Sequence, residues 1–276
     1  MKSGFSILIP TWNNLPHLKL LIRSLKENSA VEHQILIHVN EGNDGTVDWL
    51  KEQGFPFNHS EENIGICKAM NGLFEMADRQ YIVYFNDDMY ACQDWDQSMQ
   101  NAINESSDNR FYFSATMIEP RATGNKCVVD FDAGSGTENF REQDLNDHLP
   151  NLKKSDWNGA SWPPSLMHRD TWKEIGGFSE EFSPGLYSDP DIGMKLWQAG
   201  VRDFRGIGDS LVYHFMQKST GRVKLNDGKK QFLLKWRVSA SNFNKNTLKL
   251  GTDYNGPLPD AKINPSIKDR IKRLLK

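Results

Sequence analysis

A run of apolar residues ends abruptly on polar ones in the segment YIVYFNDDMY, which spans residues 81–90. Asn86, Asp87 and Asp88 follow Phe85 directly. Two adjacent carboxylates repel one another, and burying them is costly unless a positive group compensates. One explanation is a simple turn, because Asn and Asp favour turns. The other is a divalent cation, which takes hard oxygen ligands from carboxylates.

The elements around this segment place it beside other polar clusters. Apolar patterns predict alternating strands and helices, in the order 5–10, 15–28, 34–39, 46–53, 66–77 and 81–85. Such alternation predicts an α/β fold with a mostly parallel central sheet, whose ligands bind beyond the carboxyl ends of the strands. Polar clusters at residues 11–14, 40–46 and 86–88 fall at those ends. Their shared placement favours a ligand site over a simple turn.

Composition bounds the class of protein. The chain has 276 residues, of which 38% are hydrophobic and 25% charged, enough for one large domain or one domain with an appendage. A formal net charge of -3 argues against a dedicated nucleic-acid binder, which normally carries excess positive charge. Cys67, Cys92 and Cys127 are too scattered for a disulfide framework or a zinc site. We expect a cytoplasmic protein, because no apolar run resembles a signal peptide or a membrane span.

The second half of the chain is less regular. Periodicity fades between residues 119 and 157, where we expect a long irregular region of the kind that shapes a substrate cleft or lid. Regular patterns return at 165–178 and 191–200, followed by a strand at 210–215 and an amphipathic helix at 229–243.

Six segments, in order along the chain, resemble the motifs of family 2 glycosyltransferases with the GT-A fold. They are SILIPTWNN from residue 6, VNEGNDGT from 39, NIGICKAMNGL from 63, FNDDM from 85, IGGFSEEFSPGLYSDPDIGMKLWQAG from 175, and VYHF with KSTG from 212. The likeness runs from about residue 5 to 222. It implies a GT-A catalytic domain over 1–222, followed by a C-terminal helical extension over 223–276.

The resemblance also implies an activity. Relatives of this kind are inverting, metal-dependent enzymes that move a sugar from a nucleotide-sugar donor to a saccharide or lipid-linked saccharide acceptor. The expected setting is the synthesis of cell-surface polysaccharide or lipopolysaccharide.

The metal site implied by the resemblance centres on Asp88, which matches the last acidic position of the family's DxD motif. Mn2+ or Mg2+ held there would neutralise the diphosphate as the sugar leaves. His214 matches the family's late histidine and is the second expected ligand. The alternative is that His214 is not a metal ligand and has only a structural role, with its ring nitrogens hydrogen-bonded within the protein.

The same resemblance assigns the donor to the strand ends. Pro10, Thr11 and Asn13 are expected to line the slot for the base, and Glu41 to accept the ring N–H of uracil or thymine. A UDP-sugar is the favoured donor. The pair Asn40-Glu41 replaces the family's usual Asp-Asp, which leaves dTDP- and GDP-sugars open.

Further donor contacts are expected from five residues. Asn86 stands where many relatives have Asp, and its amide oxygen can still accept a ribose hydroxyl. Asp87 is expected to bind metal through water or to hold the ribose. Lys68, Lys218 and Ser219 are expected to contact the donor, and each also fits an ordinary solvated position.

Inverting transfer needs a carboxylate that takes the proton from the acceptor hydroxyl. The segment YSDPDIGMK offers Asp189 and Asp191. Asp189 aligns with the Asp of the family's ED pair, with Ser188 in place of the Glu, so Asp189 is the preferred base and Asp191 the alternative. Asp189 also fits a helix N-cap followed by Pro190, which is compatible with a catalytic role.

Other functions fit the same fold class less well. A nucleotidyltransferase needs a Gly-rich phosphate loop after the first strand, and a dinucleotide oxidoreductase needs G-x-G-x-x-G there. The segment PTWNNLPHLK contains no glycine. A catalytically inactive nucleotide-sugar or carbohydrate-binding module stays open, because the NE and SDPD segments depart from the family pattern.

The last residues, NPSIKDRIKRLLK, predict a basic amphipathic helix capped by Asn264 or Ser266. Its apolar face is formed by Ile267, Ile271, Leu274 and Leu275. Such a helix either lies on an anionic membrane surface or packs on the catalytic domain with its charges in water. The first alternative predicts peripheral membrane contact through residues 264–276, at the inner face of the membrane.

Overall fold

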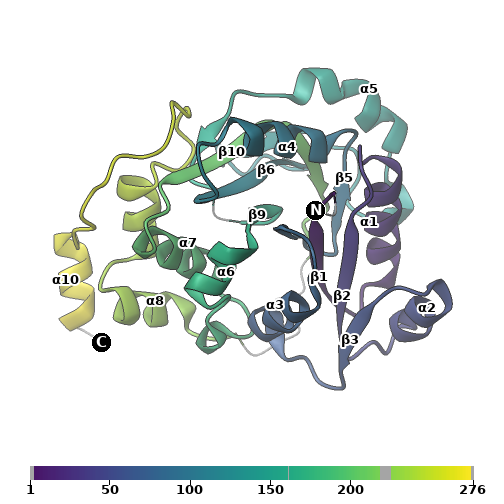
Figure 1. Ribbon diagram of the computed structural model, residues 1–276, viewed down its shortest axis with the longest axis horizontal. Coiled ribbons are helices and arrows are strands. Elements are labelled where there is room, and N and C mark those ends of the chain that lie inside the picture. The colour runs from purple at the N-terminus through teal and green to yellow at the C-terminus, as the bar shows by residue number, and fades with distance from the viewer. Residues whose placement is uncertain (1–2, 161, 218–224, 275–276) are drawn as a thin grey trace.

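The computed structural model describes residues 3–160, 162–217 and 225–274. Within these residues, ten strands form one sheet, with the order β3-β2-β1-β4-β9-β6-β10-β5 and with β7 beside β6 and β8 beside β10 (Figure 1). The strands are β1 Ser6–Trp12, β2 Gln34–Asn40, β3 Phe57–Ser60, β4 Tyr81–Tyr84, β5 Met89–Ala91, β6 Phe111–Glu119, β7 Val129–Asp130, β8 Trp157–Asn158, β9 Ser165–His168 and β10 Asp203–His214.

Helices cover both faces of this sheet. They are α1 Leu15–Glu27, α2 Thr46–Gln53, α3 Gly65–Met76, α4 Trp95–Glu105, α5 Glu142–Leu152, α6 Arg169–Ile175, α7 Ser188–Gln198, α8 Gly228–Trp236, α9 Ala240–Asn242 and α10 Ile267–Leu274. Single 3-10 turns occur at Thr137–Asn139 and Glu180–Phe182, and a π-helical turn at Phe243–Thr247.

Parallel pairing dominates the part of the sheet where the polar clusters lie. β1 pairs in parallel with β2 and with β4, and β2 pairs in parallel with β3. β6 and β10 are also parallel, whereas β9, β5 and β8 run antiparallel to their neighbours. The predicted α/β fold is confirmed, and the carboxyl ends of β1, β2 and β4 meet at one edge of the sheet.

Alternating side chains of β1 belong to two separate core layers, as the pleat of a strand requires. Ile7 and Ile9 are buried against α1 and α4, whereas Leu8 is buried against α3 and its neighbours α6, α7 and α8. The strand is therefore fixed from both sides, which fixes the loop that follows it at the edge of the sheet.

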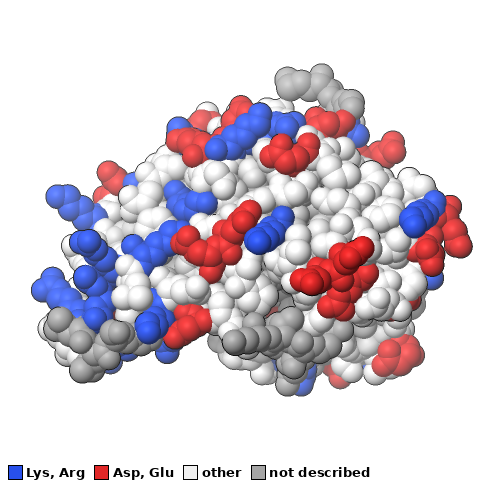
Figure 2. All heavy atoms as spheres, turned by 90° about the horizontal axis from the view of Figure 1, so that it is seen from below, with Lys and Arg blue, Asp and Glu red and all other residues white. Residues whose placement is uncertain are grey.

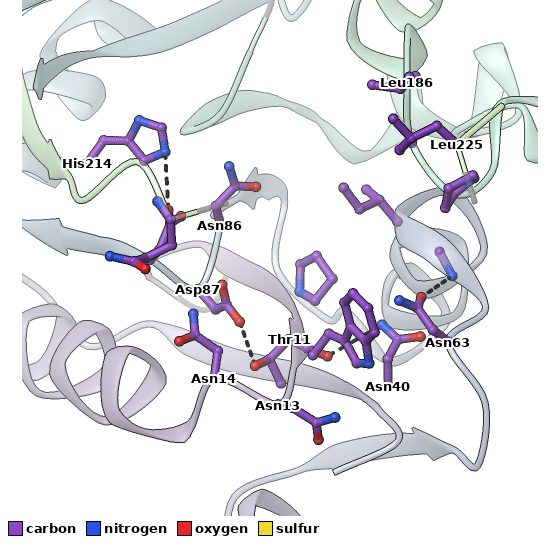
Figure 3. A pocket seen from close by; sticks show the side chains of 18 residues that line it. Thr11, Asn13, Asn14, Asn40, Asn63, Asn86, Asp87, Leu186, His214 and Leu225 are labelled. Atoms are coloured by element: carbon purple, nitrogen blue, oxygen red, sulfur yellow. Dashed lines mark hydrogen bonds and ion pairs between the residues drawn. The ribbon is translucent and has the colours of Figure 1, made fainter. Parts of the chain in front are cut away.

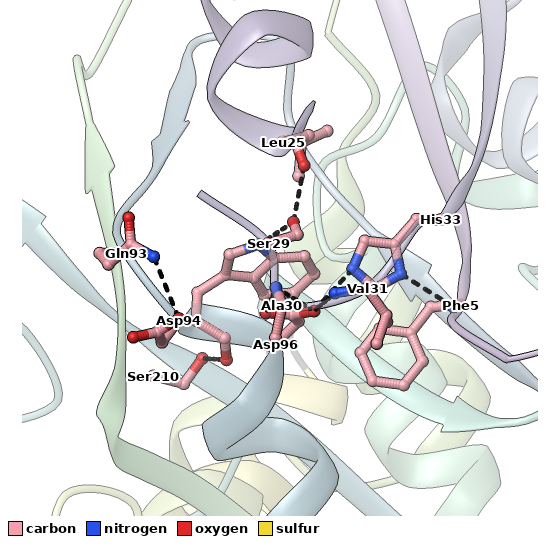
Figure 4. A network of polar contacts seen from close by, with 11 residues as sticks. Phe5, Leu25, Ser29, Ala30, Val31, His33, Gln93, Asp94, Asp96 and Ser210 are labelled. Carbon is pink, nitrogen blue, oxygen red and sulfur yellow. Dashed lines mark hydrogen bonds and ion pairs between the residues drawn. The ribbon is translucent and has the colours of Figure 1, made fainter. Parts of the chain in front are cut away.

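A buried polar network ties α4 to the connection between α1 and β2 (Figure 4). The carboxylate of Asp96 accepts hydrogen bonds from the amides of Ala30, at 2.9 Å, and Val31, at 3.2 Å. It also lies 3.1 Å from Nε2 of His33, whose Nδ1 accepts from the amide of Phe5 at 3.0 Å. Because Nδ1 accepts, the proton of His33 is on Nε2 and is donated to Asp96.

One prediction about the middle of the chain is wrong in part, and one strand there was not predicted. The region at 119–157 was expected to be irregular, but it contains α5, whose buried residues are Leu145 and Leu152. Seven residues separate these leucines, so they share a helix face although polar residues fill most of the interval. β6 was not expected either, because FYFSATMIE is buried at every position and shows no alternation.

The amphipathic helix predicted over 229–243 is interrupted. α8 ends at Trp236 and is followed by Arg237, which has a left-handed φ of 61°. α9 begins after Ser239, whose side chain accepts a hydrogen bond from the amide of Asn242. Because the side chain of Ser239 caps the start of α9, it favours a new helix over continuation of α8.

Residues after 222 pack on the same core as the rest of the chain. Phe232 and Phe243 are buried in the cluster that contains Ile192 of α7, and Trp157 of β8 forms an isolated β-bridge with Asp253. The division into domains at residue 222 stays a prediction. Among the residues described, no helix combines the length and apolarity needed to cross a membrane.

Candidate active site

A cleft of about 500 Å³ lies at the carboxyl ends of β1, β2 and β4, a size that suits a small-molecule ligand (Figure 3). Most residues predicted from the sequence to bind a donor or a metal line it: Pro10, Thr11, Asn13, Asn86, Asp87, Asp88 and His214. Figure 3 shows Asn40 and Asn63 at one end of the cleft and His214 at the other. The structure thus brings together groups that are up to two hundred residues apart in the chain.

The two adjacent aspartates have different partners. Asp87 Oδ2 accepts a hydrogen bond from Thr11 Oγ1 at 2.7 Å, which ties it to the end of β1. Burial and the neighbouring charge of Asp88 raise the pKa of Asp87 to about 7. Asp88 is bound on the other side, by β10 and the residues that follow it. Separate donors offset part of the repulsion between the two carboxylates, and the part that remains contributes to the raised pKa of Asp87.

Asp88 and His214 form an ion pair at one end of the cleft. Oδ2 of Asp88 lies 3.4 Å from Nε2 of His214 and accepts the amide of Gln217 at 2.8 Å. Burial would raise the pKa of Asp88, but His214, the Gln217 amide and His17 hold it below its ordinary value. Burial would lower the pKa of His214, but Asp88 and Glu119 raise it to about 9.

Glu119 is a member of this site that the sequence analysis missed. Its Oε1 lies 3.1 Å from Nδ1 of His214, and its side chain is 8% exposed. The pairing of β6 with β10, which puts Ile118 opposite Tyr213, brings Glu119 beside His214. The sequence shows only a glutamate at the start of a region expected to be irregular, and without knowledge of β6 no signal connects it to His214.

The pair Asp88 and His214 fits a divalent cation. A carboxylate and an imidazole, close together at the wall of a polar cleft, are two of the ligands that Mn2+ accepts in proteins. In residues 3–160, 162–217 and 225–274 no group of three or more His, Cys, Asp or Glu is arranged to hold a metal. The remaining ligands would therefore have to come from water and from a bound diphosphate, as is usual for such sites.

The end of β2 presents Asn40, and not Glu41, to the cleft. Asn40 is buried, and its Oδ1 accepts the amide of Ile64 at 2.9 Å. Glu41 has a left-handed φ of 61°, and its carboxylate accepts a hydrogen bond from Asn13 Nδ2 at 3.0 Å. The structure thus places Glu41 outside the residues that line the cleft, and its expected contact with the base stays a prediction. Asn40, the neighbouring residue, lines the cleft and is the better placed of the two to contact the base.

The wall opposite β1 depends on a glycine. Gly65, at the start of α3, has a φ of 79°, and a Cβ added there would lie 2.6 Å from Cα of Pro184. The amide of Ile66 donates to the carbonyl of Pro184 at 2.9 Å. This close approach brings Gly185 and Leu186, which line the cleft and precede α7, against the start of α3.

The two candidate bases differ in their surroundings. Asp191 is 1% exposed, and its Oδ1 lies 2.9 Å from Nζ of Lys235 and 2.7 Å from Nε1 of Trp236. Asp189 is partly exposed, and burial raises its pKa to about 7. α7 begins at Ser188 after Tyr187, so Asp189 lies in the first turn and is not the N-cap.

Of the other predicted donor contacts, the structure describes only Lys68. Lys68 is exposed on α3 and is not among the lining residues. Lys218 and Ser219 lie outside the described residues. Trp12, Asn14 and Asn40 line the cleft and lie in the predicted polar clusters, although none was singled out. The lining residues outside those clusters that were not predicted are Asn63, Gly65, Ile66, Pro184, Gly185, Leu186, Gln217 and Leu225.

Comparison with known families gives one match. Residues 6–154, which contain the cleft residues contributed by β1, β2, α3 and β4, match the family described as Glycosyl transferase family 2. Among curated proteins, none matches this chain.

Solved structures of TarS from S. aureus have a similar fold. The TarS 1–349 fragment in complex with UDP-GlcNAc aligns with a TM-score of 0.60 at 13% identity, over 84% of this chain and 65% of that one. The same fragment in complex with UDP aligns with a TM-score of 0.57 at 14% identity, over 76% of this chain and 60% of that one. This chain therefore spans less than two thirds of the TarS fragment, and at such identities the likeness shows the fold alone.

Proposed function

Because this chain belongs to glycosyl transferase family 2, we propose that its cleft binds a UDP-sugar and transfers the sugar to an acceptor hydroxyl with inversion at the anomeric carbon. The observation that carries this proposal is the placement of Asp88 and His214 at one end of a polar cleft whose other end is lined by Asn40 and Asn63. The uracil would lie at the asparagine end and the diphosphate at the Asp88 end.

The choice of a UDP-sugar has two sources of support. TarS, which shares the fold, is seen with UDP and with UDP-GlcNAc. The Oδ1 atom of Asn40 accepts the amide of Ile64, and one N–H of its Nδ2 faces the carbonyl of Thr11 at 3.4 Å, so the second N–H is available to an acceptor on the edge of a pyrimidine. dTDP- and GDP-sugars are the alternative donors.

The chain supplies both a metal site and a base in this proposal. Asp88 and His214 would hold Mn2+ or Mg2+, which when bound neutralises negative charge on the leaving diphosphate. Thr11 and Asp87 fix the end of β1 beside the diphosphate, and Asn86 offers its amide to the ribose. Asp189 accepts the proton of the acceptor hydroxyl while the new bond to the anomeric carbon forms and the bond to the diphosphate breaks.

The acceptor in this proposal is a saccharide, free or linked to a lipid, in the synthesis of a cell-surface polysaccharide or lipopolysaccharide. Leu186 and Leu225 line the cleft and leave an apolar rim beside the polar wall. A lipid-linked acceptor would be presented at the inner face of a membrane, so transfer would take place at that surface.

A ligand screen tests the proposal directly. UDP-, dTDP- and GDP-sugars are added to the full chain with and without Mn2+, and the melting temperature and the release of free nucleotide are recorded. We expect a UDP-sugar with Mn2+ to raise the melting temperature, because ligand binding to the folded state stabilises it by RT ln(1 + [L]/Kd). Slow release of UDP, by hydrolysis or transfer, is expected in the same samples.

Asp88→Asn is the matched variant. It retains the shape of the side chain but loses the charge, so Mn2+-dependent stabilisation and UDP release should both disappear while the fold persists. Full activity of Asp88→Asn would contradict the metal role of this residue. Binding of a UDP-sugar by the unaltered chain, with no turnover in the presence of metal and acceptor extracts, would favour an inactive nucleotide-sugar-binding module instead.

A further inference from the structure

The last helix of the described chain is docked on the molecule through its polar side. Asp269 of α10 is 1% exposed. Its Oδ1 accepts the amide of Ser239 at 3.2 Å, and its Oδ2 accepts Asn242 Nδ2 at 2.6 Å and the amide of Ser266 at 2.9 Å. Since Ser266 Oγ in turn accepts the amide of Asp269 at 3.1 Å, the two residues form a capping box that starts the helix.

The two isoleucines of α10 point the other way. Ile267 is 77% exposed and Ile271 is 50% exposed. At about 100° per residue, these two isoleucines fall on the helix face opposite Asp269. A surface helix normally buries its apolar stripe and exposes its charges. α10 does the reverse, and hydrogen bonds to Ser239 and Asn242 hold it in that orientation.

Positive charge flanks the exposed isoleucines. Lys268 and Lys272 fall on one side of the stripe and Arg270 and Arg273 on the other, and all four are exposed. Figure 2 shows Lys and Arg side chains gathered at the end of the molecule that carries α10, on the left in both Figure 1 and Figure 2.

The charge of the whole C-terminal part agrees with this local pattern. Residues 223–276 hold 13 Lys or Arg and 4 Asp or Glu, a formal net charge of +9 in a chain whose total is -3. Exposed apolar side chains gather in the same part of the sequence. Of the large exposed apolar side chains in the described residues, all but Val31 follow residue 222, and they are Leu225, Leu234, Ile267 and Ile271.

We propose that the outward face of α10, defined by Ile267, Ile271, Lys268, Arg270 and Lys272, binds the surface of a bilayer that contains anionic lipid. Charge complementarity selects this occupant: an apolar stripe with basic residues on both sides is the pattern of a helix that lies in a membrane interface. A protein partner would have to be apolar at its centre and acidic at its rim. The meaning of this membrane contact for catalysis rests on the proposed function, because a membrane surface would present a lipid-linked acceptor.

Vesicle binding tests the proposal without any sugar transfer. The full chain is mixed with vesicles of phosphatidylcholine alone or with about a quarter phosphatidylglycerol, and the bound fraction is measured by co-sedimentation at low and high salt. We expect binding only with the anionic lipid, and a large loss at high salt because surface charges are screened. Binding of equal strength to both vesicle types, or no binding to either, would overturn the proposal.

Two sets of variants assign the binding to α10. Ile267→Ser with Ile271→Ser removes the apolar stripe and should weaken vesicle binding by about tenfold or more. Lys268→Glu with Lys272→Glu should weaken it by at least as much. Val31→Ser removes an exposed apolar side chain outside the C-terminal part and should bind like the unaltered chain. Vesicle binding by the isoleucine variant equal to that of the unaltered chain would overturn the assignment to this face.

Two further measurements separate the remaining outcomes. Sedimentation velocity of the unaltered chain without lipid detects self-association, and a dimer that the isoleucine variant abolishes would mean that a second copy covers the face, which contradicts the proposal. Turnover of a UDP-sugar in solution tests the proposed function alone. Vesicle binding without any turnover would support the membrane surface while contradicting the enzyme, so the two failures are distinguishable.

Discussion

The buried carboxylate of Asp191 forms an ion pair with the partly exposed ammonium of Lys235, with Oδ1 and Nζ 2.9 Å apart, and this pair fastens α8 to α7. The same carboxylate oxygen accepts Nε1 of Trp236 at 2.7 Å, and Lys235 also contacts Glu181 at 2.9 Å. A carboxylate that is 1% exposed and held by a cation and an indole has no open side from which an acceptor hydroxyl could approach. Asp189, two residues earlier in the first turn of α7, is partly exposed and is the better candidate for the catalytic base.

Asp189→Asn and Asp191→Asn should therefore fail in different ways. Asp189→Asn should lower kcat by about a hundredfold or more, the usual scale for loss of a general base, with donor affinity near normal. Asp191→Asn should leave the folded enzyme active but lower the free energy of unfolding by about 1–3 kcal/mol, because the buried side chain loses its charge-assisted hydrogen bonds to Lys235 and Trp236. Steady-state kinetics and urea denaturation of both variants measure the difference.

The assignment fails if the two variants exchange their effects. A hundredfold loss of kcat in Asp191→Asn, at unchanged stability, would make Asp191 the base. Glu181→Gln serves as the control, since it removes only the exposed partner of Lys235 and should change stability by less than about 1 kcal/mol.

The pH dependence of activity should follow Asp189. Burial raises its pKa to about 7, and a base must be deprotonated to accept a proton, so kcat should fall as the pH drops below about 7. A flat profile between about pH 5 and pH 8 would contradict this role. The measurement is kcat at saturating donor over that range.

The carboxyl group of Asp189 also makes the stability of the fold depend on pH. Its folded pKa is raised above the unfolded value of about 3.9, so the folded state binds the extra proton and loses stability as the pH rises from about 4 to 7. Asp189→Asn removes this penalty. We expect the free energy of unfolding to rise by about 1–3 kcal/mol at about pH 8 and to stay unchanged near pH 4. Urea denaturation at the two pH values tests it, and a less stable variant at the higher pH would contradict it.

The strand ends could be predicted from the sequence, but their cross-connections could not. Apolar runs before Thr11 and Asn86 identify the edge of the sheet, because a buried parallel strand reads as a continuous apolar segment. The contact between Glu119 and His214 depends on the register of β6 with β10, and that register joins residues almost a hundred positions apart. Nothing local in either segment specifies it.

The choice between neighbouring residues also required the structure. Asn40 and Glu41 are adjacent, and which one lines the cleft depends on the left-handed φ of Glu41. Asp189 and Asp191 both lie in the first turn of α7, and only the packing of α8 against α7 shows that Asp191 is paired. Sequence patterns identify the segment, whereas long-range packing decides which side chain is available.

Glu119 should position His214 for a metal. In metal sites a carboxylate that accepts the second ring N–H of a histidine fixes the tautomer and the ring orientation, and its loss typically weakens metal binding tenfold to a hundredfold. Glu119→Ala should show that loss, and Glu119→Gln, which can still accept a hydrogen bond, should recover part of it. Mn2+ titration by electron paramagnetic resonance, in the presence of UDP, gives the affinity without any turnover.

Glu75→Ala, an exposed glutamate on α3, is the control for that series and should bind Mn2+ like the unaltered chain. If Glu119→Ala keeps normal Mn2+ affinity while its melting temperature falls, the residue has only a structural role. UDP affinity without metal should be the same in all variants, because Glu119 contacts His214 and does not line the cleft.

The network around Asp96 should be a major contributor to stability. Asp96 accepts from two amides and from His33, and burial leaves no water to replace these bonds. Asp96→Ala should lower the free energy of unfolding by about 3 kcal/mol, since buried donors lose their acceptor. Urea denaturation measures this loss. Gln97→Ala, at an exposed position of α4, should change it by less than about 1 kcal/mol, and equal effects would contradict the role of the network.

Asp269 should control whether α10 stays attached. Asp269→Ala removes the acceptor for Ser239, Asn242 and the capping box with Ser266, so α10 should open locally while the rest of the fold persists. The free energy of that opening should fall by about 1–3 kcal/mol, the range for a lost cap plus buried hydrogen bonds. Hydrogen exchange of the amides in residues 266–274 measures the opening directly, and trypsin cleavage after Lys268 gives a second readout.

Lys272→Ala, on the exposed side, should exchange like the unaltered chain. Unchanged protection in Asp269→Ala would mean that packing against α8, and not this carboxylate, holds the helix and its outward isoleucines in place.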